Sequence, residues 1–227
     1  MAKFCTNCGK PLKEGEECTC KREIKVETGE PKDYINQVLD LFKGLFLKPV
    51  DTIRMFAKEE NMVFGCCLMV ATSIFVGLFG MFFFSKLTTT TVQLFGFGTV
   101  SLEFPYFRYF MTFTLSFLIQ AVLLVFLADF LANKLFKGTS HWKTIMATLG
   151  LISMIPLVTV IIASLVLFLS MKLMFLILIT GCLYYSVLFF QGLKETTKVE
   201  ENRFGQFIAL TILIIVLIVG YIIPAIF

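Results

Sequence analysis

A stretch of 48 residues, 144–191, carries a single charged side chain, Lys172. One continuous helix of that length would extend about 70 Å, whereas the hydrocarbon core of a bilayer is roughly 30 Å thick. Residues 170–172 divide the stretch into two halves that are each long enough to cross a membrane, and they suit a turn at the bilayer surface with the lysine reaching the headgroups. The stretch therefore predicts a helical hairpin in an integral membrane protein.

The rest of the chain extends this prediction to five spans. Hydrophobic residues make up 57% of the sequence and the mean hydropathy is +0.85, which is beyond the usual range of soluble domains. We expect an all-α membrane protein whose domain 61–227 is a five-transmembrane-helix bundle in the lipid bilayer. The predicted spans cover residues 62–84, 109–131, 144–169, 173–191 and 206–226. Pro156 is expected to kink the third span.

Four cysteines stand close together in residues 1–22: Cys5, Cys8, Cys18 and Cys20. The first pair has the C-x-x-C spacing of a zinc knuckle, while the second pair is C-x-C, which is shorter than the common form. Four thiolates in so short a segment suit a tetrahedral Zn²⁺ site, and the metal would supply the fold of a segment without a core of its own. We therefore predict a zinc ribbon. The alternatives are a disordered tail with unliganded thiols and a redox dithiol.

Between the cysteines and the first span, the chain changes from a linker to an amphipathic segment. Residues 23–32 are charged and polar, as in a linker. Within residues 33–60, apolar side chains recur at helical spacing as far as residue 46, and Lys48-Pro49 ends that helix. A second, short helix can begin at Asp51 or Thr52 and run to Lys58. The pattern predicts a helix that either lies in the membrane interface or packs on the bundle.

The loop between the first two spans has a different character. Two alternating runs within residues 88–104 flank a glycine-rich turn at 96–98. This pattern predicts a small extracytoplasmic β-hairpin-like loop that leans on the membrane surface.

The distribution of charge predicts the topology and excludes one class of function. Residues 1–61 contain 11 basic and 11 acidic side chains, and such a neutral head argues against nucleic-acid binding. With the N-terminus inside, the inner loops contain more lysine and arginine than the outer loops, as the positive-inside rule requires. We expect a multi-pass protein of the cell membrane with a cytoplasmic N-terminus and an extracytoplasmic C-terminus. Cysteines in the cytoplasm stay reduced and available for zinc.

Several segments resemble known families. Residues 4–15 (FCTNCGKPLKEG) resemble the zinc ribbons at the N-termini of many bacterial membrane proteins. Residues 46–53 (FLKPVDTI), 138–156 and 192–196 (GLKET) resemble corresponding parts of the Yip1 family, whose architecture is five spans after a cytoplasmic N-terminal region. Eukaryotic members are linked to vesicle traffic and Rab-type GTPases, whereas the zinc ribbon points to a bacterial relative of undefined role.

The sequence contains no catalytic motif of a common enzyme class, such as HExxH, GxSxG, a P-loop or GxGxxG. Asp129 lies near the inner end of the second span, where it can be hydrated or paired, and Gln120 lies mid-span, where an interhelical hydrogen bond is the simplest role. The single histidine, His141, stands beside Trp142 at the interface. We therefore expect a protein that is not an enzyme.

Three functions follow as hypotheses. The first is a scaffold or adaptor that recruits a protein partner through the zinc ribbon. The second is a small transporter or channel subunit, based on Asp129, Gln120 and Pro156. The third is a sensor of zinc or envelope stress. The sequence leaves the partner and the oligomeric state open.

Overall fold

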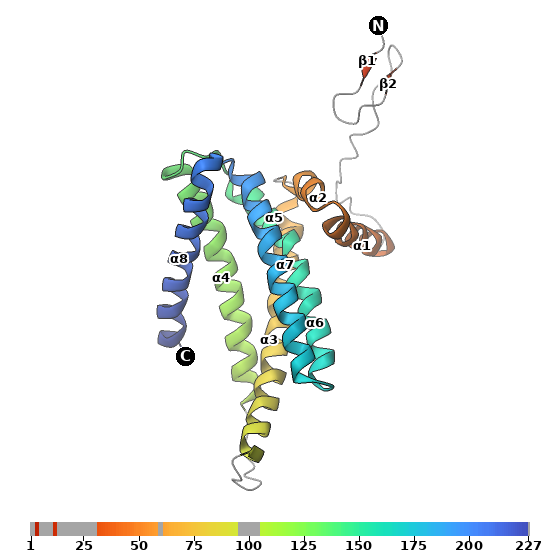
Figure 1. Ribbon diagram of the computed structural model, residues 1–227, viewed down its shortest axis with the longest axis vertical. Helices are drawn as coiled ribbons and strands as arrows, with labels where there is room; N and C mark the ends of the chain where they lie inside the picture. Colours follow the sequence, from red (N-terminus) through yellow and green to blue (C-terminus); the bar gives the residue numbers. More distant parts are fainter. Residues whose placement is uncertain (1–2, 5–10, 13–30, 59–60, 95–104, 227) are drawn as a thin grey trace.

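The computed structural model describes residues 3–4, 11–12, 31–58, 61–94 and 105–226 (Figure 1). Its strands are β1 (Lys3–Phe4) and β2 (Pro11–Leu12), which pair antiparallel with Lys3 opposite Leu12 and Phe4 opposite Pro11. Its helices are α1 (Pro31–Leu47), α2 (Pro49–Phe56), α3 (Met62–Leu94), α4 (Tyr106–Lys134), α5 (Trp142–Ile152), α6 (Met154–Leu167), α7 (Met171–Thr197) and α8 (Glu201–Ile226).

The expected number of spans is confirmed within the described residues. Five helical segments are long and apolar enough to cross a bilayer. Four of them belong to α3, α4, α7 and α8, while α5 and α6 together form the fifth. The predicted hairpin of residues 144–191 is therefore α5–α6 followed by α7. The helices extend beyond the predicted spans because polar residues at a span's end can still continue the helix.

The prediction of a β-hairpin in the first loop is wrong for its first strand. Residues 88–94 are helical and belong to α3, which ends at Leu94. Threonine and valine are common in strands, but this preference depends on the packing around them, and adding a turn to an existing helix costs far less than starting a separate element. The remainder of the predicted hairpin, residues 95–104, lies outside the described residues.

The spans alternate in direction through the bundle. In Figure 1, α3, α5–α6 and α8 run downward, while α4 and α7 run upward. The helices α1 and α2, the α4–α5 connection and the α7–α8 connection consequently lie at one end of the bundle, and the α6–α7 turn lies toward the other.

The segment 145–155 is the centre of the packing, because every residue in it is buried. It covers most of α5 and the start of α6, and it packs against α3, α4 and α7 and against α2. A helix that is apolar on all sides is expected at the core of a bundle. The third span is thus surrounded by protein along its first half.

Two glycines allow α3 and α5 to approach closely. A Cβ atom added to Gly150 would lie 2.3 Å from the Cα atom of Gly65, and one added to Gly65 would lie 2.8 Å from the Cα atom of Ala147. The helix backbones are therefore in contact at this crossing. Small residues at such crossings let membrane helices gain van der Waals contact, because lipid provides little hydrophobic driving force between helices.

The third span is interrupted at Ser153, between α5 and α6. Pro156, the residue predicted to kink this span, lies three positions later and cannot donate a hydrogen bond to the carbonyl of Ile152. The hydroxyl of Thr72 on α3 lies 3.1 Å from the carbonyl oxygen of Ser153, and the hydroxyl of Ser153 lies 2.6 Å from the carbonyl of Gly150. Buried hydroxyls thus satisfy backbone groups next to the break.

The close crossing leads to a prediction about Gly150. Its replacement by alanine should force α3 and α5 apart, at a cost of about 1–3 kcal/mol for overpacking. The midpoint of heat-induced loss of the monodisperse peak, measured by size-exclusion chromatography in detergent, should fall. Gly205 on α8 provides the control, since nothing lies within 4 Å of a Cβ atom added there. Gly205→Ala should leave the midpoint unchanged or raise it, and an equal loss in both variants would contradict the prediction.

Candidate functional site

Three segments that are far apart in the sequence meet at one end of the bundle. They are residues 48–58 in and after α2, residues 133–142 between α4 and α5, and residues 192–203 at the end of α7 and the start of α8 (Figure 1). We call this region the junction end. It includes parts of the three segments that resemble the Yip1 family in sequence, residues 46–53, 138–156 and 192–196.

Apolar side chains fasten α1 and α2 to the bundle. Leu45 of α1 and Ile53 and Phe56 of α2 are fully buried. They belong to one hydrophobic cluster with Leu151 of α5 and Leu188 of α7. Burying a side chain of this size contributes about 1.5–3 kcal/mol. The buried face of the amphipathic segment therefore packs on the bundle.

The opposite side of α1 and α2 exposes large apolar side chains. Leu39 is 48% exposed, Phe46 53%, Leu47 80% and Met55 42%. Exposed apolar groups of this size beside lysines are typical of helices that lie in the membrane interface. Packing on the bundle is thus observed for one face of this segment, and the location of its other face in the membrane interface stays a prediction.

Polar contacts add to this attachment. The hydroxyl of Tyr184 on α7 donates a hydrogen bond of 2.7 Å to the carbonyl oxygen of Leu45, the last buried residue of α1. Arg54 of α2 donates two hydrogen bonds to Glu195 of α7, one of 3.0 Å from Nε and one of 2.8 Å from Nη2. The hydrogen bond to the Glu195 carboxylate raises the pKa of Arg54, because it stabilises the charged guanidinium group.

The two connections at the junction end contact each other. The backbone N–H of Thr139 donates a hydrogen bond of 3.1 Å to the carbonyl oxygen of Thr197. That same oxygen would lie 2.4 Å from a Cβ atom added to Gly138, so only glycine fits there. Lys137 and Lys198 adopt the left-handed conformation, with φ of 54° and 48°, which turns the chain sharply after each helix.

Asp129 belongs to this junction and does not line the pocket described below. Its Oδ1 atom accepts hydrogen bonds from the hydroxyl of Ser140 (2.7 Å) and from the amide of Asn133 (3.2 Å). The Oδ1 atom of Asn133 in turn accepts a hydrogen bond of 2.9 Å from the backbone of Ser140. The carboxylate therefore fixes the α4–α5 connection, as expected for an acid that is paired at the membrane boundary.

The junction end is rich in exposed basic side chains. They come from α2, both connections and the first turn of α8. At the opposite end, the described part of the chain has Lys86, Arg108 and Lys172. The exposed basic residues of the junction end are Lys48, Arg54, Lys58, Lys134, Lys137, Lys194, Lys198 and Arg203, and Lys43 of α1 is exposed as well.

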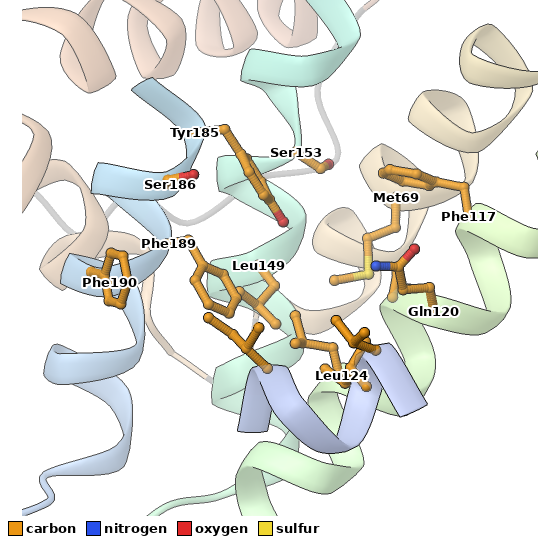
Figure 2. A pocket seen from close by; sticks show the side chains of 14 residues that line it. Met69, Phe117, Gln120, Leu124, Leu149, Ser153, Tyr185, Ser186, Phe189 and Phe190 are labelled. Atoms are coloured by element: carbon orange, nitrogen blue, oxygen red, sulfur yellow. The ribbon is translucent and has the colours of Figure 1, made fainter. Parts of the chain in front are cut away.

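A pocket of about 290 Å³ lies deeper in the bundle, among α3, α4, α5, α7 and α8 (Figure 2). Gln120 of α4 and Tyr185 of α7 are on its walls, together with aromatic and aliphatic side chains. Three lining residues on α7 and α8 are exposed, namely Phe190 (41%), Ile212 (43%) and Val216 (61%). The pocket therefore reaches the lateral surface of the bundle between these two helices.

The predicted metal ligands cannot be placed in this geometry. Cys5, Cys8, Cys18 and Cys20 all lie outside the described residues. Among the described residues, no three cysteine, histidine or carboxylate side chains are close enough to hold a metal ion. His141 is the residue that precedes α5, and its side chain does not cap that helix.

Two structural features of the site were not predicted from the sequence. The Arg54–Glu195 pair joins residues separated by 141 positions, and no local pattern marks a pair of that separation. The pocket arises from five helices that meet only in the folded chain. Gln120, at the middle of the second span, was the one sequence signal for this pocket, because an amide within a membrane span needs a hydrogen-bond partner.

Comparison with known proteins agrees with the motifs. The family model for the Yip1 domain matches residues 43–223, which include all the helices from the end of α1 to most of α8. No curated protein and no solved structure matches the chain.

The Arg54–Glu195 pair leads to a second prediction. Arg54→Glu and Glu195→Arg should each lower the thermal midpoint of the purified protein in detergent, because each single variant places like charges together between α2 and α7. The double variant should regain most of the loss, since it restores an ion pair.

The control uses the more exposed pair Lys194–Glu201, whose side chains are 52% and 82% exposed. Exchanging these two charges should have little effect, because exposed ion pairs contribute little. A double variant of Arg54 and Glu195 that is as unstable as the sum of its single variants would show that the ion pair does not hold α2.

Proposed function

Because the chain belongs to the Yip1-domain family, we propose that it is a non-enzymatic multi-pass membrane protein that acts as a scaffold or adaptor. In this proposal, a zinc ribbon formed by residues 1–22 recruits a protein partner to the membrane. The five-span bundle anchors the ribbon and holds its point of attachment in a fixed position.

The attachment of α1 and α2 carries this proposal. In the sequence, α1 follows the N-terminal segment and its predicted linker, and α1–α2 is fixed to the bundle by buried Leu45, Ile53 and Phe56 and by the Arg54–Glu195 pair. Because α1 and α2 are packed on the bundle, the chain that precedes α1 is attached to the bundle at a fixed point. A loose tether would need no such contacts.

Zinc would be held by the thiolates of Cys5, Cys8, Cys18 and Cys20. The antiparallel pairing of β1 with β2 supports this, because residues 3–4 and 11–12 flank the first cysteine pair in the sequence. Bound zinc would give the segment a fixed shape that a partner can recognise.

The basic junction end supports a cytoplasmic orientation for the ribbon. Exposed lysines and arginines at this end outnumber those in the described residues of the other end. Cytoplasmic loops carry such an excess, and anionic lipids of the inner leaflet attract it. The orientation would place the C-terminus outside the cell membrane.

The zinc proposal predicts the metal content and the partners of the purified protein. The wild type should contain about one zinc per chain, because four thiolates complete one tetrahedral site. Cys5→Ser combined with Cys8→Ser should abolish bound zinc, measured by elemental mass spectrometry. Crosslinking in membranes followed by purification should recover a protein partner from the wild type and lose it from this variant.

Cys67→Ser combined with Cys182→Ser serves as the matched control, because these exposed cysteines lie in α3 and α7. It should keep both the zinc and the partner. An unchanged set of crosslinked proteins after loss of zinc would refute recruitment through the ribbon.

The orientation is tested separately. In a background without native cysteines, Lys137→Cys at the junction end and Lys172→Cys at the start of α7 provide one label site at each end. A membrane-impermeant maleimide added to intact cells should label only the cysteine at position 172, and permeabilised cells should allow both to react. Labelling of position 137 in intact cells would reverse the proposed topology.

A further inference from the structure

The pocket among α3, α4, α5, α7 and α8 contains two polar groups that form no hydrogen bond with any of the described residues. Within the described part of the chain, neither the amide of Gln120 nor the hydroxyl of Tyr185 has a hydrogen-bond partner. Two serines on the same walls differ from them: Ser153 bonds to the carbonyl of Gly150 and Ser186 to that of Cys182. Gln120 and Tyr185 are thus the groups available to a ligand.

These two groups come from opposite walls of the pocket. Figure 2 shows Tyr185 reaching from α7 and Gln120 from α4 toward the space between the two helices. Each can donate a hydrogen bond, the tyrosine through its hydroxyl and the glutamine through its NH₂ group. A ligand between them would be held best if it had an acceptor oxygen on each of two sides.

The depth of the pocket restricts the ligand further. Gln120 lies at the midpoint of α4 (Tyr106–Lys134), and Tyr185 lies near the middle of α7 (Met171–Thr197). Both helices are long and apolar enough to span a bilayer, so we expect the pocket to lie in its hydrocarbon region, while charged headgroups stay at the surfaces. None of the described residues that line the pocket carries a charge. The ligand must therefore be neutral and must dissolve in the hydrocarbon core.

The remaining walls favour a planar ring. Phe117, Phe189 and Phe190 contribute aromatic surfaces, and Met69 contributes a polarisable sulfur atom. Aromatic rings pack well against such groups in stacked or edge-on arrangements. The opening between α7 and α8, marked by exposed Ile212 and Val216, gives a chain attached to the ring a direct path into the bilayer.

We propose that this pocket binds an isoprenoid quinone. The two carbonyl oxygens of the ring would accept hydrogen bonds from Gln120 and Tyr185, the ring would lie among the aromatic side chains, and the isoprenoid tail would leave between α7 and α8. The site is separate from the junction end and does not depend on recruitment through the zinc ribbon.

Binding of a radiolabelled benzoquinone with a decyl side chain to the full-length protein in nanodiscs tests the proposal. The wild type should bind this compound saturably, and decylbenzene, which lacks the two oxygens, should compete at least tenfold more weakly. Tyr185→Phe removes only the hydroxyl and should weaken binding roughly five- to tenfold, as expected for one hydrogen bond. Gln120→Leu should weaken it by a similar factor.

Ser186→Ala is the matched control, because its hydroxyl lies on the same wall but bonds to its own helix. It should bind the quinone like the wild type. If Gln120→Leu fails to give a monodisperse protein, Tyr185→Phe alone decides the test. Absence of saturable binding, equal competition by decylbenzene, or unchanged affinity in Tyr185→Phe would each overturn the proposal.

Discussion

The backbone contact between α3 and α5 at Gly65 and Gly150 is the constraint on which the rest of the bundle depends. Lipid chains solvate apolar helices almost as well as other helices do, so membrane helices associate where their surfaces fit closely. With glycine on both helices, α5 comes near enough to be surrounded by α3, α4 and α7. This position explains why residues 145–155 are all buried, although most of the other residues in the spans are not fully buried inside the bundle.

The buried α5 also determines what forms at the junction end. Leu151 provides part of the surface on which α1 and α2 pack, and the Arg54–Glu195 pair closes the same contact from the side of α7. The α4–α5 and α7–α8 connections then meet through Thr139 and Thr197. The three Yip1-like motifs thus belong to one packed region, because the segments that contain them contact one another there.

Several polar side chains within the spans form hydrogen bonds with the backbone of their own helix. Thr159, Ser164, Thr180 and Thr211 each donate a hydrogen bond to the carbonyl four residues earlier in the same helix. Gln120 and Tyr185 differ because they reach across a pocket rather than along a helix. In hydrocarbon an unpaired polar group is costly, and this cost is the reason why these two groups support the proposed ligand site.

The sequence by itself determined that this is a five-span helical membrane protein, that residues 144–191 form a hairpin, and where its family motifs lie, because length and hydropathy limit how a chain can cross a bilayer. It also located the interruption of the third span to within a few residues of Pro156. The alternating pattern wrongly predicted a strand at residues 88–94, where the favourable continuation of α3 outweighed the strand preference of threonine and valine. Only the tertiary structure decided that Gly65 meets Gly150, that Arg54 pairs with Glu195 and that Gln120 and Tyr185 line the same pocket. Each of these depends on a distance between segments remote in sequence, which no local periodicity contains.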